Sequence, residues 1–299
     1  MSDFWSALSK CLESETGLRL VSGSEREQGG GCINAAWLVS AENLKGEKRS
    51  LFVKANRLEK LAMFETEAAA LAEIAETNTI RVPCPVWCGE AGNRSALVLE
   101  AISMQRSPGA RFEEEMGRQL ARMHRVTESR GRFGWDRDNV IGETPQPNGW
   151  MDSWPAFFAK RRIGFQLELA ADRGRNFRGS EALGEAIPKF FSHYNPAPSL
   201  LHGDLWGGNA AFDEGGNPVI FDPATYYGDR EADLAFTELF GGFSSAFYRG
   251  YESEWPLDPG FAQRKTLYNL YHVLNHDHLF GGGYVVRAQG MIDTLLRPR

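Results

Sequence analysis

The sequence predicts an α+β fold of two lobes, a small β-rich N-terminal lobe with one long helix and a larger, mainly helical C-terminal lobe. Short apolar segments with partial alternation are frequent before residue 101, and long amphipathic segments dominate after residue 103. The 299 residues suffice for two lobes that share a cleft. We therefore expect an N-terminal lobe over residues 1–102 and a C-terminal lobe over residues 103–299, joined by a linker near 101–103.

The expected N-terminal lobe begins with a helix over residues 3–14, which Gly17 ends. Its other expected elements are strands at 18–22, 35–40 and 50–55, a helix rich in Ala, Leu and Glu at 58–76, and strands at 86–88 and 96–100. This order predicts one sheet accompanied by helices.

The expected C-terminal lobe begins with an amphipathic helix over residues 111–126, followed by a polar stretch with Gly and Pro over 127–149. Strand and loop are expected at 199–222, and further helices at 153–171, 181–194, 231–239, 262–275 and 284–296. The strand-and-loop region therefore interrupts a helical lobe.

Composition excludes several functions. The net charge is −6 and no basic stripe occurs, so we expect no nucleic-acid partner. No run of 18 apolar residues occurs and residues 1–10 lack signal-peptide features, so we expect a cytoplasmic protein without membrane spans. The four cysteines, Cys11, Cys32, Cys84 and Cys88, fit neither a disulfide framework nor a zinc site.

The segment His202–Asn209 carries the strongest chemical signal. Asp204 and Asn209 have the spacing of a kinase catalytic loop, in which Asp is the base and Asn, five residues later, binds Mg²⁺. Asp222 follows a short apolar strand. In kinases, an aspartate in this place is a second ligand of Mg²⁺. The alternative is that these are polar turn residues. The ordered set favours a protein-kinase-like fold that uses ATP and Mg²⁺.

Residues of the N-terminal lobe complete the predicted nucleotide site. Lys54 lies within an apolar strand, and beside such a catalytic loop it is expected to meet the ATP α- and β-phosphates. Glu67 on the long helix is the expected partner of Lys54, and Glu65 is its rival. Gly29, Gly30 and Gly31 would let backbone N–H groups approach phosphate, although any hairpin could use them.

Main-chain atoms of Glu100 and Ile102, at the junction of strand and linker, are expected to meet the adenine edge. Cys32 adjoins the glycines and could be a redox handle, with an inert buried thiol as the alternative. These assignments depend on the catalytic loop.

Two features argue against a protein kinase. Only about seven residues separate Asp222 from the next helix signal, too few for an activation segment that holds a peptide. Gly203 also stands where protein kinases carry an Arg that reads the phosphorylated segment. We therefore expect a small substrate, and we expect Asp233 to brace the catalytic loop by accepting backbone N–H bonds.

The chain resembles the fructosamine kinase (ketosamine-3-kinase) family, within the aminoglycoside phosphotransferase and choline kinase group. The motifs that carry this resemblance lie at 29–33, 52–54, 139–142, 144–148, Trp154, 201–209, 221–243, and from Tyr268 through Asn275 and His276 to Gly281. The resemblance implies phosphorylation of the 3-hydroxyl of a ribulosamine, erythrulosamine or fructosamine, after which the adduct leaves and the amine is restored. It therefore implies a deglycation enzyme with a small-molecule ketoamine or a glycated amine as its substrate.

Other features remain open at this level. Trp206 is suited to pack against a sugar ring, with a core aromatic as the alternative. Asp277 and His278 depart from the Leu-Asn expected in relatives, which puts fine substrate preference in doubt. His272 and His276 are four residues apart, but structural histidines are expected there rather than a metal site.

Two other functions remain possible from the sequence. A kinase for another amino-alcohol or an aminoglycoside would be favoured by an acidic cluster in the substrate pocket. An inactive kinase-like binding protein would lack one of Lys54, Asp204, Asn209 or Asp222, and all four are present. We expect the protein to be a monomer.

Overall fold

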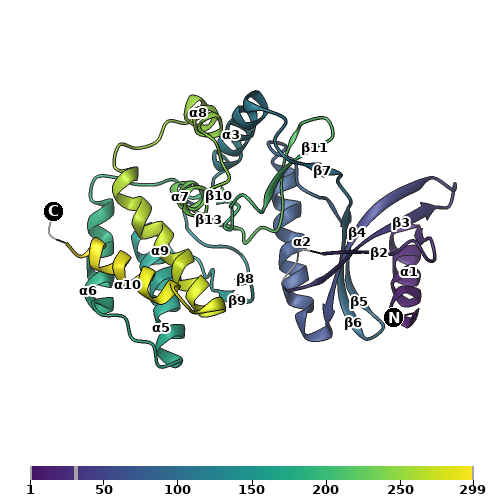
Figure 1. Cartoon of the computed structure of the whole chain (residues 1–299), viewed down its shortest axis with the longest axis horizontal. Helices are drawn as coiled ribbons and strands as arrows, with labels where there is room; N and C mark the ends of the chain where they lie inside the picture. Colours follow the sequence, from purple (N-terminus) through teal and green to yellow (C-terminus); the bar gives the residue numbers. More distant parts are fainter. Residues whose placement is uncertain (1, 30–32, 298–299) are drawn as a thin grey trace.

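The computed structural model describes residues 2–29 and 33–297, and these form two lobes (Figure 1). The predicted two-lobed α+β architecture is confirmed. The small lobe contains an antiparallel sheet of order β1-β3-β4-β6-β5, in which β2 also pairs with β3. Its strands are β1 Leu18–Leu20, β2 Arg26–Gln28, β3 Ala35–Asn43, β4 Lys48–Arg57, β5 Pro85–Ala91 and β6 Arg94–Glu100.

Helices cover the two faces of this sheet: α1, Ser2–Thr16, packs on one face and α2, Leu61–Glu76, on the other (Figure 1). Because side chains alternate along a strand, Val53 of β4 packs with α1 while Lys54 lies on the α2 face. In β6, Val98 packs in the α1 cluster and Leu97 in the α2 cluster. The sequence alternation therefore directs Lys54 towards the second lobe.

The large lobe is mainly helical. Its α-helices are α3 Ala110–His124, α4 Trp154–Phe157, α5 Phe165–Asp172, α6 Ser180–Ala186, α7 Glu231–Leu239, α8 Ser245–Glu254, α9 Phe261–Phe280 and α10 Tyr284–Leu295. Short strand pairs accompany them: β10 Ser199–Leu201 with β13 Tyr226–Gly228, β8 Asn139–Ile141 with β9 Thr144–Gln146, and β11 Ala210–Asp213 with both β12 Pro218–Ile220 and β7 Met104–Gln105.

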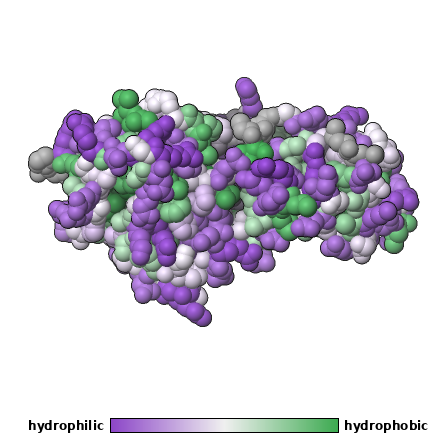
Figure 2. Space-filling view, turned by 90° about the horizontal axis from the view of Figure 1, so that it is seen from below, coloured by the Kyte–Doolittle hydropathy of each residue, from purple (hydrophilic) through white to green (hydrophobic). Residues whose placement is uncertain are grey.

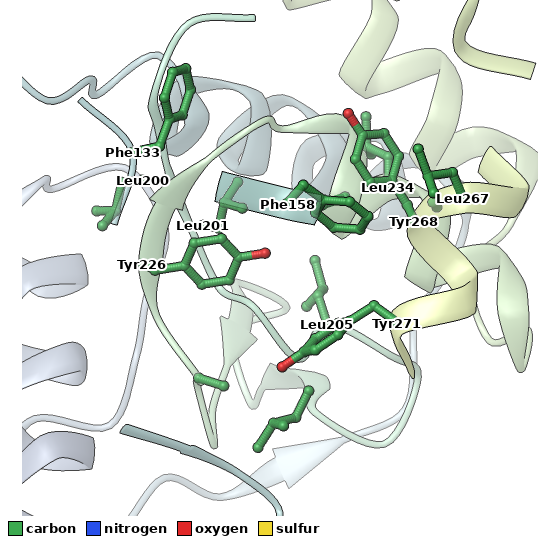
Figure 3. Packing of buried hydrophobic residues seen from close by; sticks show 14 of the residues in the cluster. Phe133, Phe158, Leu200, Leu201, Leu205, Tyr226, Leu234, Leu267, Tyr268 and Tyr271 are labelled. Atoms are coloured by element: carbon green, nitrogen blue, oxygen red, sulfur yellow. The ribbon is translucent and has the colours of Figure 1, made fainter. Parts of the chain in front are cut away.

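Two hydrophobic clusters form the core. The smaller cluster lies between α1 and the outer face of the sheet, around Leu8, Leu12 and Val53. The larger one fills the C-terminal lobe, where Tyr226, Tyr268 and Phe158 converge (Figure 3), and it also contains residues of α2. The α2 helix therefore belongs to the N-terminal lobe by sequence and shares the core of the C-terminal lobe.

Several expected elements differ in detail. The predicted helix over 153–171 is divided by a π-helical turn, Phe158–Gly164, and the predicted 58–76 helix starts with a 3₁₀ turn, Leu58–Lys60. The predicted helix over 181–194 ends as a 3₁₀ helix, Ile187–Phe191, at Pro188, which cannot donate a helical hydrogen bond. Strands β2, β7, β8 and β9 and helix α8 were not predicted.

The face shown in Figure 2 is mainly hydrophilic, with apolar residues in small scattered groups. Within residues 2–29 and 33–297, no helix has both the length and the apolar character needed to cross a membrane.

Candidate active site

The loop from His202 to Asn209 leaves β10 and is fixed by a carboxylate beneath it. The Asp233 side chain, on α7, accepts the backbone N–H groups of His202 at 2.7 Å and Gly203 at 2.9 Å. His124 donates to the same carboxylate at 3.1 Å. Burial alone would raise the pKa of Asp233, but the hydrogen bond and charge of His124 outweigh burial and lower it. The predicted bracing role of Asp233 is confirmed.

Gly203 allows two strands of the site to approach closely. Its φ is +81°, and an added Cβ would lie 2.1 Å from the carbonyl oxygen of Ala224. The approach is used, because the Ala224 N–H donates to the His202 carbonyl at 2.8 Å. The absence of the protein-kinase Arg at this position therefore has a steric cause.

His202 joins the loop to the strand that precedes Asp222. Its Nε2 lies 2.9 Å from the carbonyl oxygen of Phe221, which can only accept, so Nε2 carries the proton. Its Nδ1 accepts the Asp204 N–H at 3.3 Å. Burial lowers the pKa of His202, which favours this neutral form. A single buried imidazole therefore fixes the spacing between the Asp204 and Asp222 backbones.

Asp204 and Asn209 face each other across the loop. The Asn209 Nδ2 donates to the Asp204 carbonyl at 2.9 Å and to its carboxylate at 3.1 Å. The pKa of Asp204 is raised well above its usual range, first by desolvation and then by the negative charge of Asp222. Within residues 2–29 and 33–297, no partner is seen for the Asn209 Oδ1, so this oxygen is left for a cation.

Asp222 has a left-handed backbone conformation, with φ of +56°, and its side chain is about half exposed. Positive φ is rare outside glycine and often marks functional sites. Its carboxylate accepts from Lys54 Nζ at 2.5 Å. The Asp222 carboxylate and the Asn209 amide oxygen are both hard oxygen ligands, the kind that Mg²⁺ prefers. The residues present therefore fit a magnesium ion.

Lys54 of the N-terminal lobe pairs with a carboxylate of the C-terminal lobe. Its Nζ donates to Glu67 on α2 at 2.6 Å as well as to Asp222, and Lys54 is 8% exposed. Burial would lower the pKa of Lys54, but the two carboxylates outweigh burial and raise it. Glu65 is exposed and makes no such contact, so the pairing predicted for Glu67 over Glu65 is confirmed.

The other predicted nucleotide contacts are placed less completely. Gly29 ends the described part of the glycine segment, and Gly30, Gly31 and Cys32 lie outside the described residues. The Glu100 N–H donates to the Cys84 carbonyl at 2.8 Å and its side chain pairs with Arg81 at 2.6 Å. Because its N–H is already bonded, Glu100 would meet adenine through its carbonyl oxygen. The role of Ile102 stays a prediction.

Trp206 projects from the catalytic loop and is 40% exposed, so it is not a core aromatic. Gly207 next to it meets Gly242, whose Cα would lie 3.0 Å from an added Cβ on Gly207. The catalytic loop thus abuts the loop after α7, and the exposed indole lies against Gly208 of the catalytic loop itself.

A buried polar network behind the site was missed by the sequence analysis. Gln146 Nε2 donates to the Ala224 carbonyl at 3.0 Å and Asn139 Nδ2 to the Thr225 carbonyl at 2.9 Å, while Tyr271 OH donates to Gln146 at 2.6 Å. This network holds the backbone that follows Asp222. The signal was present, because Asn139 and Gln146 belong to the motifs shared with the fructosamine kinase family.

The histidine and aspartate residues near the end of α9 have packing roles. His272 stacks on Phe236 with ring centroids 3.6 Å apart, and burial lowers its pKa to about 3. Asp277 is buried and pairs with Arg175, while His278 accepts from Arg173 through its backbone carbonyl at 2.5 Å. Asp277 and His278, which stand where relatives are expected to have Leu-Asn, therefore each contact an arginine that follows α5.

Comparisons with known proteins agree with this geometry. Residues 4–298 match the family model described as fructosamine kinase. A Synechocystis protein provisionally assigned as a ketoamine kinase is 46% identical over 98% of this chain and 97% of its own length. The chloroplastic protein-ribulosamine 3-kinase of Arabidopsis thaliana is 42% identical over 90% of this chain and 81% of its own.

Solved structures show the same relationship. A structure from Haemophilus somnus, provisionally assigned as a fructosamine-3-kinase, has a TM-score of 0.89 at 31% identity and covers 99% of both chains. The aminoglycoside phosphotransferase APH(2'')-Ib has a TM-score of 0.62 at 11% identity over 96% of this chain and 98% of its own, which shows a shared protein-kinase-like fold alone. With the family model spanning almost the whole sequence, the chain belongs to the fructosamine kinase family.

Proposed function

We propose that the protein transfers the γ-phosphoryl group of ATP, with Mg²⁺, to the 3-hydroxyl of a ketosamine and so serves deglycation. The observation that carries this proposal is the assembly of Lys54, Glu67 and Asp222 with Asp204 and Asn209 where the two lobes meet, in a member of the fructosamine kinase family. The names of the relatives, ketoamine kinase and ribulosamine 3-kinase, support this substrate class.

Asp204 would orient the sugar hydroxyl and accept its proton as the oxygen attacks the γ-phosphorus and ADP leaves. Its raised pKa suits a group that must accept a proton during the reaction. Lys54, held by Glu67, would neutralise the α- and β-phosphates. Asn209 and Asp222 would hold the magnesium ion, which would supply positive charge to offset that of the phosphates.

Peripheral residues have proposed binding roles. Gly29, Gly30 and Gly31 would cover the phosphates, and main-chain atoms of Glu100 and Ile102 would meet adenine. Trp206, which is exposed, would pack on the sugar ring. We also propose that the protein acts as a monomer in the cytoplasm.

The alternatives receive less support. A catalytically inactive protein would not need Lys54 paired to two carboxylates beside an intact catalytic loop. The names of the relatives, ketoamine kinase and ribulosamine 3-kinase, favour a ketoamine over an aminoglycoside.

The experiment is ATP turnover with Mg²⁺ on ribulosamines, erythrulosamines, fructosamines, aminoglycosides and choline, with the phosphorylated position identified by NMR. We expect phosphate on O3 of a ketoamine. Turnover on aminoglycoside or choline alone would overturn the substrate class, and no turnover with any ketoamine would contradict the proposal. Size-exclusion chromatography tests the monomer.

A further inference from the structure

Glu73, on α2, makes two contacts that the catalytic assembly does not explain. Its Oε2 accepts the indole N–H of Trp135 at 2.7 Å, and its Oε1 accepts the hydroxyl of Tyr227 at 2.8 Å. Both donors belong to the C-terminal lobe, and Trp135 is buried. Hydrogen bonds to an ionised acceptor are stronger than neutral ones, so Glu73 is a firm connection between the lobes.

The two donors belong to the framework of the catalytic loop. Tyr227 lies in β13 opposite Leu200 of β10, the strand that leads into His202. Its backbone also exchanges two hydrogen bonds with Gly134, next to Trp135, at 2.8 and 2.9 Å. Glu73 therefore ties α2 to the strands that carry the catalytic Asp204 and to the segment just after Asp222.

The same helix carries Glu67, which pairs with Lys54. Glu73 lies six positions after Glu67, which corresponds to about 9 Å along the helix and about 120° around it. Two anchors at different heights and on different sides of a helix oppose both rotation and sliding. With the Glu73 anchor in place, Glu67 is kept against Lys54.

We propose that Glu73 is a positioning residue that holds α2 in the orientation in which Glu67 keeps Lys54 ready for nucleotide phosphates. This inference rests on the proposed function, because it takes Lys54 as an ATP ligand. In protein kinases, activation-loop phosphorylation controls the position of the corresponding helix. Here the hydrogen bonds from Trp135 and Tyr227 hold the helix in place without phosphorylation. This agrees with the segment after Asp222, which is too short for such a switch.

The test compares Glu73→Ala with two other variants of α2. Glu73→Gln keeps an acceptor for Trp135 and offers a donor to the Tyr227 oxygen. Glu76→Ala removes an exposed carboxylate from the same helix and serves as the matched control. The readouts are the dissociation constant of ATP with Mg²⁺, from calorimetry on the folded protein, and the melting temperature without nucleotide.

We expect Glu73→Ala to weaken ATP binding about tenfold, the scale of a lost charge-assisted hydrogen bond. Glu73→Gln should stay within about threefold of the wild type and Glu76→Ala should match it. Because Glu73 acts through Glu67, we expect Glu73→Ala to cause no further loss of ATP affinity in a Glu67→Ala background.

Three outcomes would overturn the inference: a lower melting temperature with unchanged ATP affinity, an equal loss in Glu76→Ala, or the same tenfold loss when Glu67 is absent. The first would reduce Glu73 to a purely structural contact. Failure of the wild type to bind ATP with Mg²⁺ would instead contradict the proposed function, so the two failures can be told apart.

Discussion

Asp204 and Asp233 both lie against the catalytic loop, yet their environments have opposite effects. Asp233 is 2% exposed and accepts from His124 and from two backbone N–H groups, so its pKa is lowered despite burial. Asp204 is desolvated beside Asp222, with Asn209 as its side-chain donor, and its pKa is raised. The hydrogen-bond donors together with the sign of the neighbouring charge, rather than burial, separate the bracing carboxylate from the one suited to proton transfer.

The largest expected effect is at Asp204, where one substitution should lower activity and raise stability. Asp204→Asn should lower kcat by about 10³, or about 4 kcal/mol in activation free energy, because the proton acceptor is lost. A raised pKa in the folded state means that stability is lost as pH rises through that pKa. The neutral amide should therefore raise the melting temperature at pH 8 by about 2–4 °C.

Both quantities can be measured on one preparation, kcat with ketoamine and ATP and the melting temperature without nucleotide. Asp172→Asn, on an exposed position at the end of α5, is the matched control and should change neither. Near-normal turnover by Asp204→Asn would contradict its role as base.

At Asp233 we expect the same kind of substitution to lower the stability of the protein instead of raising it. Asp233→Asn should lower the free energy of unfolding by about 3 kcal/mol at pH 7, because an amide cannot accept from all three donors in this buried site. The lowered pKa gives stability that is present above the ordinary pKa and lost as pH falls through the folded one. Urea titrations should therefore show the difference from wild type shrinking in acid, and a pH-independent difference would be unexpected.

A smaller effect is expected at the glycine between these aspartates. Gly203→Ala should cost about 2–3 kcal/mol, since it combines left-handed backbone strain with a clash against Ala224. Gly23→Ala is the control, because Gly23 has a φ of +75° but open space around the added Cβ, and it should cost only about 1 kcal/mol. Equal losses in urea denaturation would show that the clash at Ala224 is relieved by relaxation.

The smallest expected effect is in the pH dependence of activity, which tests the raised pKa of Asp204. At saturating ATP and Mg²⁺, kcat/KM should rise with unit slope through an apparent pKa above the ordinary aspartate value of about 4. The limb reports the aspartate that must be ionised to accept a proton. An acid limb at the ordinary value would show that Asp204 is not desolvated in the complex with ATP and Mg²⁺, since desolvation is the first cause of its raised pKa.

Sequence reasoning was most successful where chemistry has a fixed spacing. Asp204, Asn209 and Asp222 lie within one short stretch, and Lys54, which was assigned from that catalytic loop and not from its own strand, pairs with Glu67 and Asp222. The network of Asn139 and Gln146 was missed, because polar residues in a stretch with Gly and Pro resemble an exposed loop until their partners, far away in sequence, are known.

Helix α8 was missed for a related reason. Gly250 lies inside it, which weakens intrinsic helix propensity. The structure explains this glycine, since an added Cβ would lie 1.9 Å from the Glu114 carbonyl oxygen on α3, and one on Gly117 would lie 2.0 Å from that of Phe247. Two glycines therefore let α3 and α8 approach closely, and tertiary packing rather than local preference forms the helix.

The core shared by α2 and the C-terminal lobe also determines how the chain can be divided. Phe64, Leu71 and Ile74 are fully buried in that cluster, which also contains Leu97 of β6 and continues into the C-terminal lobe, so a break between residues 102 and 103 would divide one continuous core and expose part of its apolar surface. Exposed apolar surface of this kind promotes aggregation. The two lobes should therefore be expressed only as one polypeptide, and each should depend on the other to reach its native state.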